Sequence, residues 1–337
     1  MIQQAISTAM EGNSLTESEA MQVMSEIMEG SATSAQIGAF LVAFRLKGET
    51  IEEVAGFARV MRAKAIRIHS SRYPLVDTCG TGGDGKHTFN ISTAAALVAA
   101  AGGACIAKHG GRASSSRTGS ADVLTALGVN IENPPEQVSA CIDEIGIGFM
   151  FAPLLHTAMR FASGPRREIG IRTVLNLLGP LTNPAGATAQ VMGVYSPEVI
   201  QTAAHVLNNL GTKRAFVVHS SDGMDEITTT GVTHIAEVRA GQVVTYDIEG
   251  RDFDFPETST DDLRGGDAQE NAIIIKAILK GVRGPHRDIV VLNAAAALMA
   301  GEISDNWEDG LSVAIEAIDS GAAEQKLNAL IRLTNKE

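Results

Sequence analysis

Glycines are concentrated in one short stretch of the sequence, DTCGTGGDG from Asp77 to Gly85, which follows a run of apolar residues. Glycine lets the backbone adopt positive φ and approach a ligand closely. A helix is expected to start near Ile91, and the free N–H groups at a helix start attract anions. The stretch is therefore interpreted as a phosphate-binding loop between a strand and a helix.

Two nucleotide-binding motifs come close to this loop, but neither is complete. The spacing G-x-G-x-x-G from Gly80 matches the dinucleotide fingerprint, which also needs an acidic residue about 20 positions later; the next strand ends instead in Lys108 and His109. A P-loop needs Ser or Thr where this chain has His87. Asp84 within the loop suits a ligand that carries both sugar hydroxyls and phosphates.

A second polar loop, KHGGRASSSRTGS over residues 108–120, follows the next predicted strand. It is rich in cations, hydroxyls and glycines. Ligands in open parallel sheets lie beyond the carboxyl ends of the strands, so the two loops are expected to share one anion site. Hydroxyl and amide groups at the start of the intervening helix add to it: Thr88, Asn90, Ser92 and Thr93.

A third loop, SSDGMDE over residues 220–226, is acidic and follows the apolar run RAFVVH. Mg²⁺ is usually held by one or two carboxylates together with water and substrate phosphates. Alone, this loop is equally well explained as a solvated acidic turn. Opposite a basic, glycine-rich phosphate site, Asp225 and Glu226 are predicted to hold magnesium.

The elements that position these loops fall into two groups. About the first 65 residues have only helical patterns, and three helices are predicted from capping-box pairs, namely Ser14 and Glu17, Thr33 and Gln36, and Thr50 and Glu53. From about Tyr73, short apolar runs alternate with helical patterns, which predicts a mainly parallel sheet covered by helices. Residues 233–255 are expected to add an antiparallel hairpin at one edge, and the chain from Gln269 to be helical.

Composition narrows the class of protein. The 337 residues are 45% hydrophobic and 20% charged, enough for a folded core and two domains. The net charge of −12 argues against a nucleic-acid or anionic-membrane binder. Three widely separated cysteines (Cys79, Cys105 and Cys141) fit a reducing compartment and favour neither disulfides nor a zinc site. With neither a signal peptide nor a long apolar segment recognised, a soluble cytoplasmic protein is predicted.

Taken together, these residues resemble the anthranilate phosphoribosyltransferase family over essentially the whole chain. The resemblance rests on long motifs in a fixed order, which are GTGGDG from Gly80, TFNIST from Thr88, KHG from Lys108, SADVL from Ser120, HxxMR from His156, RTVLNLLGPLTNP from Arg172 to Pro184, and DGMDE from Asp222.

The resemblance implies an α/β fold with a small all-helical domain, residues 1–70 completed by a segment near 172–190, and a larger α/β domain, residues 71–337. It implies transfer of phosphoribosyl from 5-phosphoribosyl 1-diphosphate to the amine of anthranilate in tryptophan biosynthesis, with Mg²⁺ as cofactor and a homodimer as the assembly. A nucleoside phosphorylase of the same architecture and a non-catalytic phosphosugar-binding homologue stay as alternatives.

Site residues follow from the matching motifs. Those expected at the phosphoribosyl diphosphate are Gly80, Gly83, Asp84, Thr88, Asn90, Ile91, Ser92, Thr93, Lys108, His109, Gly110, Gly111, Arg112, Ala113, Ser114, Ser115, Ser116 and Ser120. Those expected at the metal are Ser92, Asp225 and Glu226. Those expected at anthranilate are Gly80, Gly111 and Arg166. No catalytic acid or base is assigned; His109 and His156 are candidates.

The chain departs from the family pattern at two places in the acceptor site. Gly111 stands where the family has an asparagine that contacts the aromatic substrate, and Arg166 lies in GPRR where the family more often has Pro-Val-Arg. The diphosphate-sugar residues are unaffected. Weaker binding of anthranilate is therefore expected.

Overall fold

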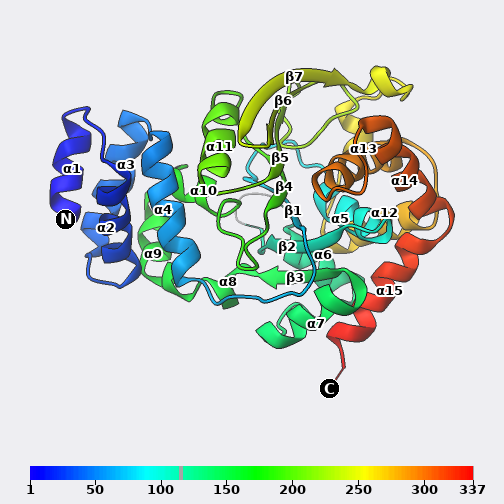
Figure 1. Cartoon of the computed structure of the whole chain (residues 1–337), viewed down its shortest axis with the longest axis horizontal. Helices are drawn as coiled ribbons and strands as arrows, with labels where there is room; N and C mark the ends of the chain where they lie inside the picture. The colour runs from blue at the N-terminus through cyan, green and yellow to red at the C-terminus, as the bar shows by residue number, and fades with distance from the viewer. Residues whose placement is uncertain (114–116, 337) are drawn as a thin grey trace.

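A computed structural model of the chain describes residues 1–113 and 117–336, and four helices precede its first strand (Figure 1). They are α1 (Ile2–Met10), α2 (Glu17–Met28), α3 (Ser34–Lys47) and α4 (Ile51–Lys64). Complete capping boxes start the last three, with Thr16, Thr33 and Thr50 as the N-caps. The expected cap at Ser14 is wrong, because Ser14 instead accepts a hydrogen bond from Lys47 Nζ at 3.2 Å.

A seven-stranded sheet forms the centre of the molecule, in the order β3-β2-β1-β4-β5-β6-β7. Its strands are β1 (Leu75–Gly80), β2 (Cys105–Gly110), β3 (Ile147–Phe151), β4 (Ala189–Gly193), β5 (Arg214–Ser220), β6 (Val232–Arg239) and β7 (Gln242–Glu249). Pairing is parallel from β3 to β5 and antiparallel for the β5–β6 and β6–β7 pairs. The chain leaves β1 toward β2 on one side and later returns to β4 on the other. This switch point is where open α/β sheets bind ligands.

Helices cover both faces of the sheet (Figure 1). Those after β1 are α5 (Ile91–Ala101), α6 (Ser120–Leu127), α7 (Pro135–Ile145), α8 (Ala152–Leu155), α9 (Arg160–Ile169), α10 (Val174–Leu178), α11 (Glu198–Asn209), α12 (Ala268–Leu279), α13 (Pro285–Ala300), α14 (Trp307–Asp319) and α15 (Ala322–Thr334). The predicted fold class, a helical module joined to a larger α/β unit with a mainly parallel sheet, is confirmed. Among the described residues, no helix combines the length and apolar character needed to cross a membrane.

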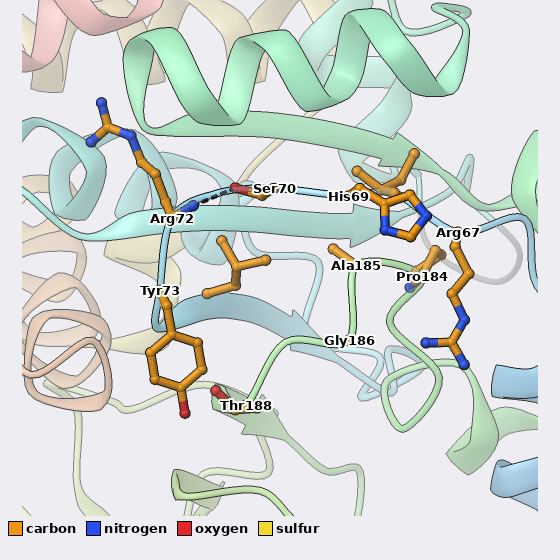
Figure 2. Close-up of a pocket in the computed structure, with 11 residues that line it drawn as sticks. Arg67, His69, Ser70, Arg72, Tyr73, Pro184, Ala185, Gly186 and Thr188 are labelled. Carbon is orange, nitrogen blue, oxygen red and sulfur yellow. Dashed lines mark hydrogen bonds between the residues drawn. The ribbon is translucent and has the colours of Figure 1, made fainter.

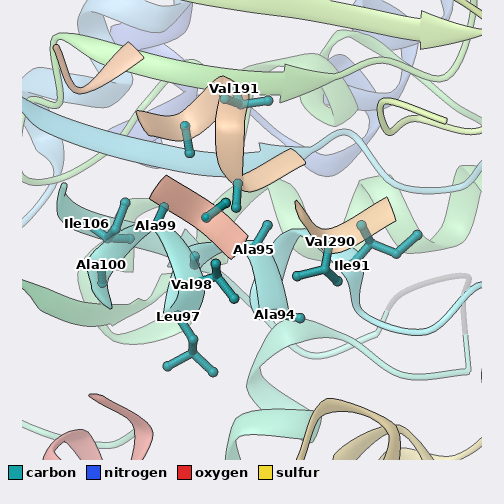
Figure 3. Close-up of a cluster of buried hydrophobic side chains, with 14 of the residues drawn as sticks. Ile91, Ala94, Ala95, Leu97, Val98, Ala99, Ala100, Ile106, Val191 and Val290 are labelled. Carbon is teal, nitrogen blue, oxygen red and sulfur yellow. The ribbon is translucent and has the colours of Figure 1, made fainter. Parts of the chain in front are cut away.

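Successive residues of one strand point to opposite faces, so neighbouring residues of one strand pack into different hydrophobic cores. Val191 of β4 packs into the core made with α5 and α13, whereas Met192 packs into the core made with α11 and the N-terminal helices. In α5 every residue from Ala94 to Ala100 is buried (Figure 3). Its alanines lie beside Ile106 of β2 and Val290 of α13, and their small size lets helices and sheet approach closely.

Three stretches of chain connect the helical module to the sheet, namely residues 65–74, 152–159 and 179–188. Residues 65–74 lead from α4 to β1 and run beside the loop 184–188, with a cavity of about 200 Å³ between them (Figure 2). There Ile68 N–H donates to the Pro184 carbonyl at 3.2 Å. Between the stretches 152–159 and 179–188, α9 and α10 pack against α2, α3 and α4, so residues distant in sequence extend the helical core.

Candidate active site

A cleft of about 1020 Å³ lies beyond the carboxyl ends of β1 and β2 and is closed on one side by α9 and α10. The predicted site residues that line it are Gly80, Gly83, Asp84, Thr88, Asn90, Ser92, Thr93, Lys108, His109, Gly110, Gly111, Arg112, Ala113, Ser120, Arg166, Asp225 and Glu226. Ile91 is the exception, because its side chain is fully buried in the hydrophobic core. Ser114, Ser115 and Ser116 lie outside the described residues.

The glycine loop turns sharply between β1 and α5. Gly82, Gly83 and Gly85 have φ of 65°, 77° and 73°, the left-handed region that other residues rarely adopt. Thr81 N–H donates to the Gly193 carbonyl at the end of β4, at 2.9 Å. The loop is thus attached to both strands that flank the switch point, and its backbone faces the cleft.

The acidic loop after β5 lies directly on these strand ends. Asp225 Oδ2 accepts the Gly82 N–H at 2.8 Å. A Cβ on Gly80 would come within 2.4 Å of that oxygen, and a Cβ on Gly193 within 1.6 Å of the Asp225 carbonyl. The absence of side chains at both glycines is therefore what lets Asp225 reach the cleft.

Asp225 and Glu226 form a partly buried acidic pair that is short of positive charge. Burial raises the pKa of each carboxyl above its usual range, and charge repulsion, from Asp84 on Asp225 and from Asp225 on Glu226, raises it further. One oxygen of Glu226 accepts the Ser92 N–H at 3.1 Å. Carboxylate oxygens that lie close together, repel one another and are partly shielded from water suit a divalent cation.

The metal would need ligands beyond these side chains. Within residues 1–113 and 117–336, no group of three or more His, Cys, Asp and Glu side chains is arranged to hold a metal ion. Mg²⁺ characteristically completes its octahedron with water and substrate phosphates, so a two-carboxylate site next to a phosphate-binding loop fits it.

Lys108 is the cation at the base of the cleft, with 3% of its surface exposed. Its Nζ donates to the Thr78 carbonyl, and burial lowers its pKa while Asp77 and other acidic neighbours oppose that shift. Asp77 is fully buried and accepts hydrogen bonds from His109 N–H at 3.0 Å and Asn183 Nδ2 at 2.8 Å. A buried carboxylate thus fixes the start of the second loop against β1.

Two histidines lie side by side beneath the cleft, with His109 and His156 ring centroids 5.0 Å apart. Their rings hydrogen-bond to the carbonyls of Gly179 and Thr182, and both Nε2 atoms are buried without a partner among the described residues. Burial lowers the pKa of His109 to about 3 and that of His156 to about 4. Both imidazoles are therefore neutral near pH 7.

The buried histidines should make the free energy of unfolding depend on pH below about 6.5. The unfolded state takes up a proton on His156 as the pH falls below 6.5, whereas the folded state resists it down to about 4, so stability is lost across that window. From this shift the loss is roughly 3 kcal/mol by pH 4. Urea unfolding between about pH 7.5 and about pH 4.5 should show a smaller loss in His156→Asn than in the unsubstituted protein. The exposed His69→Asn is the control, and equal pH dependence in all three proteins would contradict the prediction.

The acceptor side of the cleft is formed by α9 and the second loop. Arg166 lies in the last turn of α9, and burial lowers its pKa from the usual value, although arginine stays charged at neutral pH. A Cβ on Gly111 would meet no atom of the described residues within 4 Å, so those residues leave room for a larger side chain. Gly110 differs, since its Cβ would fall 2.1 Å from Ser120 Oγ.

Sequence reasoning did not assign several residues that line the cleft. Those on the helical side come from α9, α10 and the turns next to them and include Met159, Ser163, Arg167, Arg172, Asn176 and Gly179. The long motif that begins at Arg172 was the available signal, but it was assigned to the completion of the helical domain rather than to a wall of the site.

Comparison with known proteins agrees with this arrangement. The family model for the helical bundle domain of a glycosyl transferase family matches residues 3–65, and the model for its a/b domain matches residues 72–324. A curated anthranilate phosphoribosyltransferase from Acetivibrio thermocellus is 55% identical over 335 residues, covering 99% of this chain and 97% of the relative. The chain belongs to the anthranilate phosphoribosyltransferase family.

Solved anthranilate phosphoribosyltransferases share the fold. The Thermus thermophilus enzyme superposes with a TM-score of 0.94 at 44% identity, covering 98% of this chain and 99% of that one. The Saccharomyces cerevisiae enzyme, solved in complex with PRPP and Mg, gives a TM-score of 0.89 at 26% identity and covers 99% of this chain and 97% of that one. The similarity therefore includes both the helical module and the sheet.

Proposed function

We propose that this protein transfers the phosphoribosyl group of 5-phosphoribosyl 1-diphosphate to the amine of anthranilate. The products are N-(5-phosphoribosyl)anthranilate and pyrophosphate, and the step belongs to tryptophan biosynthesis. The observation that carries the proposal is the convergence of three loops, after β1, β2 and β5, on one cleft that has Arg166 on its opposite wall. Anthranilate phosphoribosyltransferases at 55% and 53% identity over nearly the whole chain support it.

The diphosphate end of the donor would lie at the glycine loop and the start of α5. Backbone N–H groups of the loop, the hydroxyls of Ser92 and Thr93, and the Lys108 ammonium border the cleft and would bind phosphate oxygens. Asp225, Glu226 and Ser92 would hold Mg²⁺, which when bound supplies positive charge to the leaving diphosphate. The remaining donor contacts are assigned, as predicted, to the second loop from Lys108 to Ser120.

The reaction needs charge stabilisation and alignment more than proton transfer. Loss of pyrophosphate leaves positive charge on the anomeric carbon, and the aromatic amine must lie in line with it. Arg166 would bind the anthranilate carboxylate and so orient the amine toward the sugar. An aromatic amine is neutral near pH 7, so neither His109 nor His156 is needed as a strong base.

A fluorescence assay tests the proposal. Anthranilate fluorescence should fall only when 5-phosphoribosyl 1-diphosphate and Mg²⁺ are both present, and one pyrophosphate should appear per anthranilate consumed. Phosphate-dependent release of a base from a nucleoside would indicate the phosphorylase alternative. Donor binding with no turnover would indicate the non-catalytic alternative.

Gly111→Asn should tighten anthranilate binding. An asparagine side chain offers both a donor and an acceptor to the substrate, and no atom of residues 1–113 or 117–336 lies within 4 Å of the new Cβ. One added hydrogen bond to a charged group is worth roughly 1.5–3 kcal/mol, so the anthranilate KM should fall about tenfold or more. Steady-state kinetics with each substrate varied in turn would show this, with Gly111→Ala as the control. An unchanged or higher anthranilate KM in Gly111→Asn would mean that another group already fills this role.

We also propose an oligomeric state and a cellular compartment for this protein. The resemblance implies a homodimer, and the three cysteines are free thiols, which is consistent with a cytoplasmic protein. Neither nucleic acid nor a membrane is expected as a partner of this acidic chain.

A further inference from the structure

Arg172 connects the helical side of the cleft to the glycine loop. It lies in the short turn between α9 and α10, and these two helices pack against the N-terminal helices. From there its Nη2 donates to the Gly83 carbonyl at 2.7 Å, across 89 residues of sequence. Gly83 has a φ of 77°, so the bond holds the loop at a point where the backbone turns.

The guanidinium of Arg172 also stacks on an aromatic ring. Its central carbon lies 3.8 Å from the centroid of the Tyr195 ring, well within the range of a cation–π contact. Tyr195 follows β4 and is partly buried, and the charges of Arg45 and Glu49, at the end of α3 and in the following turn, act on its phenol. The helical module, the end of β4 and the glycine loop therefore meet at Arg172.

The Arg172 hydrogen bond acts on a part of the glycine loop that the contacts of the loop with Gly193 and Asp225 do not reach. The contacts of Thr81 with Gly193 and of Gly82 with Asp225 hold only the first half of the loop. The Arg172 hydrogen bond holds the second half and brings a positive charge to it.

We propose that Arg172 is a positioning residue, which holds the glycine loop in its phosphate-binding shape and couples that shape to the helical module through Tyr195. The proposal rests on the proposed function for its choice of ligand. It predicts that binding of 5-phosphoribosyl 1-diphosphate depends on Arg172 although the guanidinium binds the protein backbone. Anthranilate, held on the other wall by Arg166, should depend on it much less.

The experiment compares four variants in the full-length protein. Arg172→Ala removes the hydrogen bond and the stack, and Arg172→Lys keeps the charge but not the planar guanidinium. Tyr195→Leu removes the ring, and Tyr195→Phe keeps it. Calorimetry with 5-phosphoribosyl 1-diphosphate and Mg²⁺ gives Kd, and steady-state kinetics gives both KM values and kcat. Thermal melting without ligand reports the fold.

The expected result is a donor Kd and KM raised about tenfold in Arg172→Ala, from loss of one charge-assisted hydrogen bond. Arg172→Lys and Tyr195→Leu should show smaller increases and Tyr195→Phe none. The anthranilate KM at saturating donor should change by less than about twofold in all four. An unchanged donor Kd in Arg172→Ala overturns the proposal, as does an equal rise in both KM values with a lower melting temperature.

The donor-binding measurement keeps this proposal separate from the proposed function. Calorimetry needs no acceptor, so a protein that binds the donor but does not consume anthranilate refutes the reaction and still tests Arg172. Conversely, an active protein whose Arg172→Ala variant binds the donor normally refutes only the role of Arg172.

Discussion

Replacing Asp225 by Asn together with Glu226 by Gln is expected to abolish nearly all magnesium-dependent turnover, by roughly a thousandfold or more. The amides keep the size of the side chains and an oxygen to accept the N–H groups of Gly82 and Ser92. They remove the two negative charges that would hold the metal. Activity at limiting Mg²⁺, and its recovery on adding more metal, measures the effect.

The same double variant should be more stable than the unsubstituted protein in the absence of metal. Burial raises the pKa of both carboxyls, and repulsion by Asp84 on Asp225 and by Asp225 on Glu226 raises it further, so their ionised forms destabilise the folded state at neutral and higher pH. Amides carry no such penalty, and the melting temperature without Mg²⁺ should rise. Asp261→Asn, which changes an exposed ion pair with Arg264, is the control. Full activity of the double variant at limiting Mg²⁺ would contradict the assignment of these residues as metal ligands.

Lys108→Met is expected to raise the KM for 5-phosphoribosyl 1-diphosphate by one to two orders of magnitude. Met has nearly the length of lysine and leaves little cavity, so the main change is loss of a buried ammonium next to Asp77 and Glu226. A hydrogen bond to a charged ligand is worth roughly 1.5–3 kcal/mol, which gives this range.

The KM for anthranilate should change less in Lys108→Met, because the ammonium lies at the base of the cleft on the donor side. Steady-state kinetics with each substrate varied separates the two effects, and Lys86→Met, in the glycine loop, serves as the matched lysine control. If only the KM for anthranilate changes, Lys108 belongs to the acceptor side of the site.

Sequence patterns predicted the elements whose signals are local. Capping boxes located α3 and α4, because a threonine and its acidic or amide partner satisfy free N–H groups within a single turn. The same rule could not choose between Ser14 with Glu17 and Thr16 with Glu19, since both pairs have the right spacing; tertiary contacts decide for Thr16. Helix α1 was missed because Met1 provides no capping side chain.

The site was predictable where each loop follows a strand, and less so where distant segments meet. The residue types of the glycine loop and of Asp225 and Glu226 indicate phosphate and metal chemistry without a structure. The contact of Arg172 with Gly83 depends on how α9 and α10 pack against the sheet, which no local pattern encodes. The stacking of Arg172 on Tyr195 could not be predicted from the sequence for the same reason.

The alanine-rich packing of α5 has a consequence for how the enzyme can move. Because Ala94 to Ala100 are buried on every side, between the sheet and α13, the start of α5 cannot shift without opening the core. The hydroxyls of Ser92 and Thr93 are thus immobilised when the chain folds, and little conformational entropy is lost there when a ligand arrives. The diphosphate side of the cleft is therefore held in one shape by the core before a ligand binds.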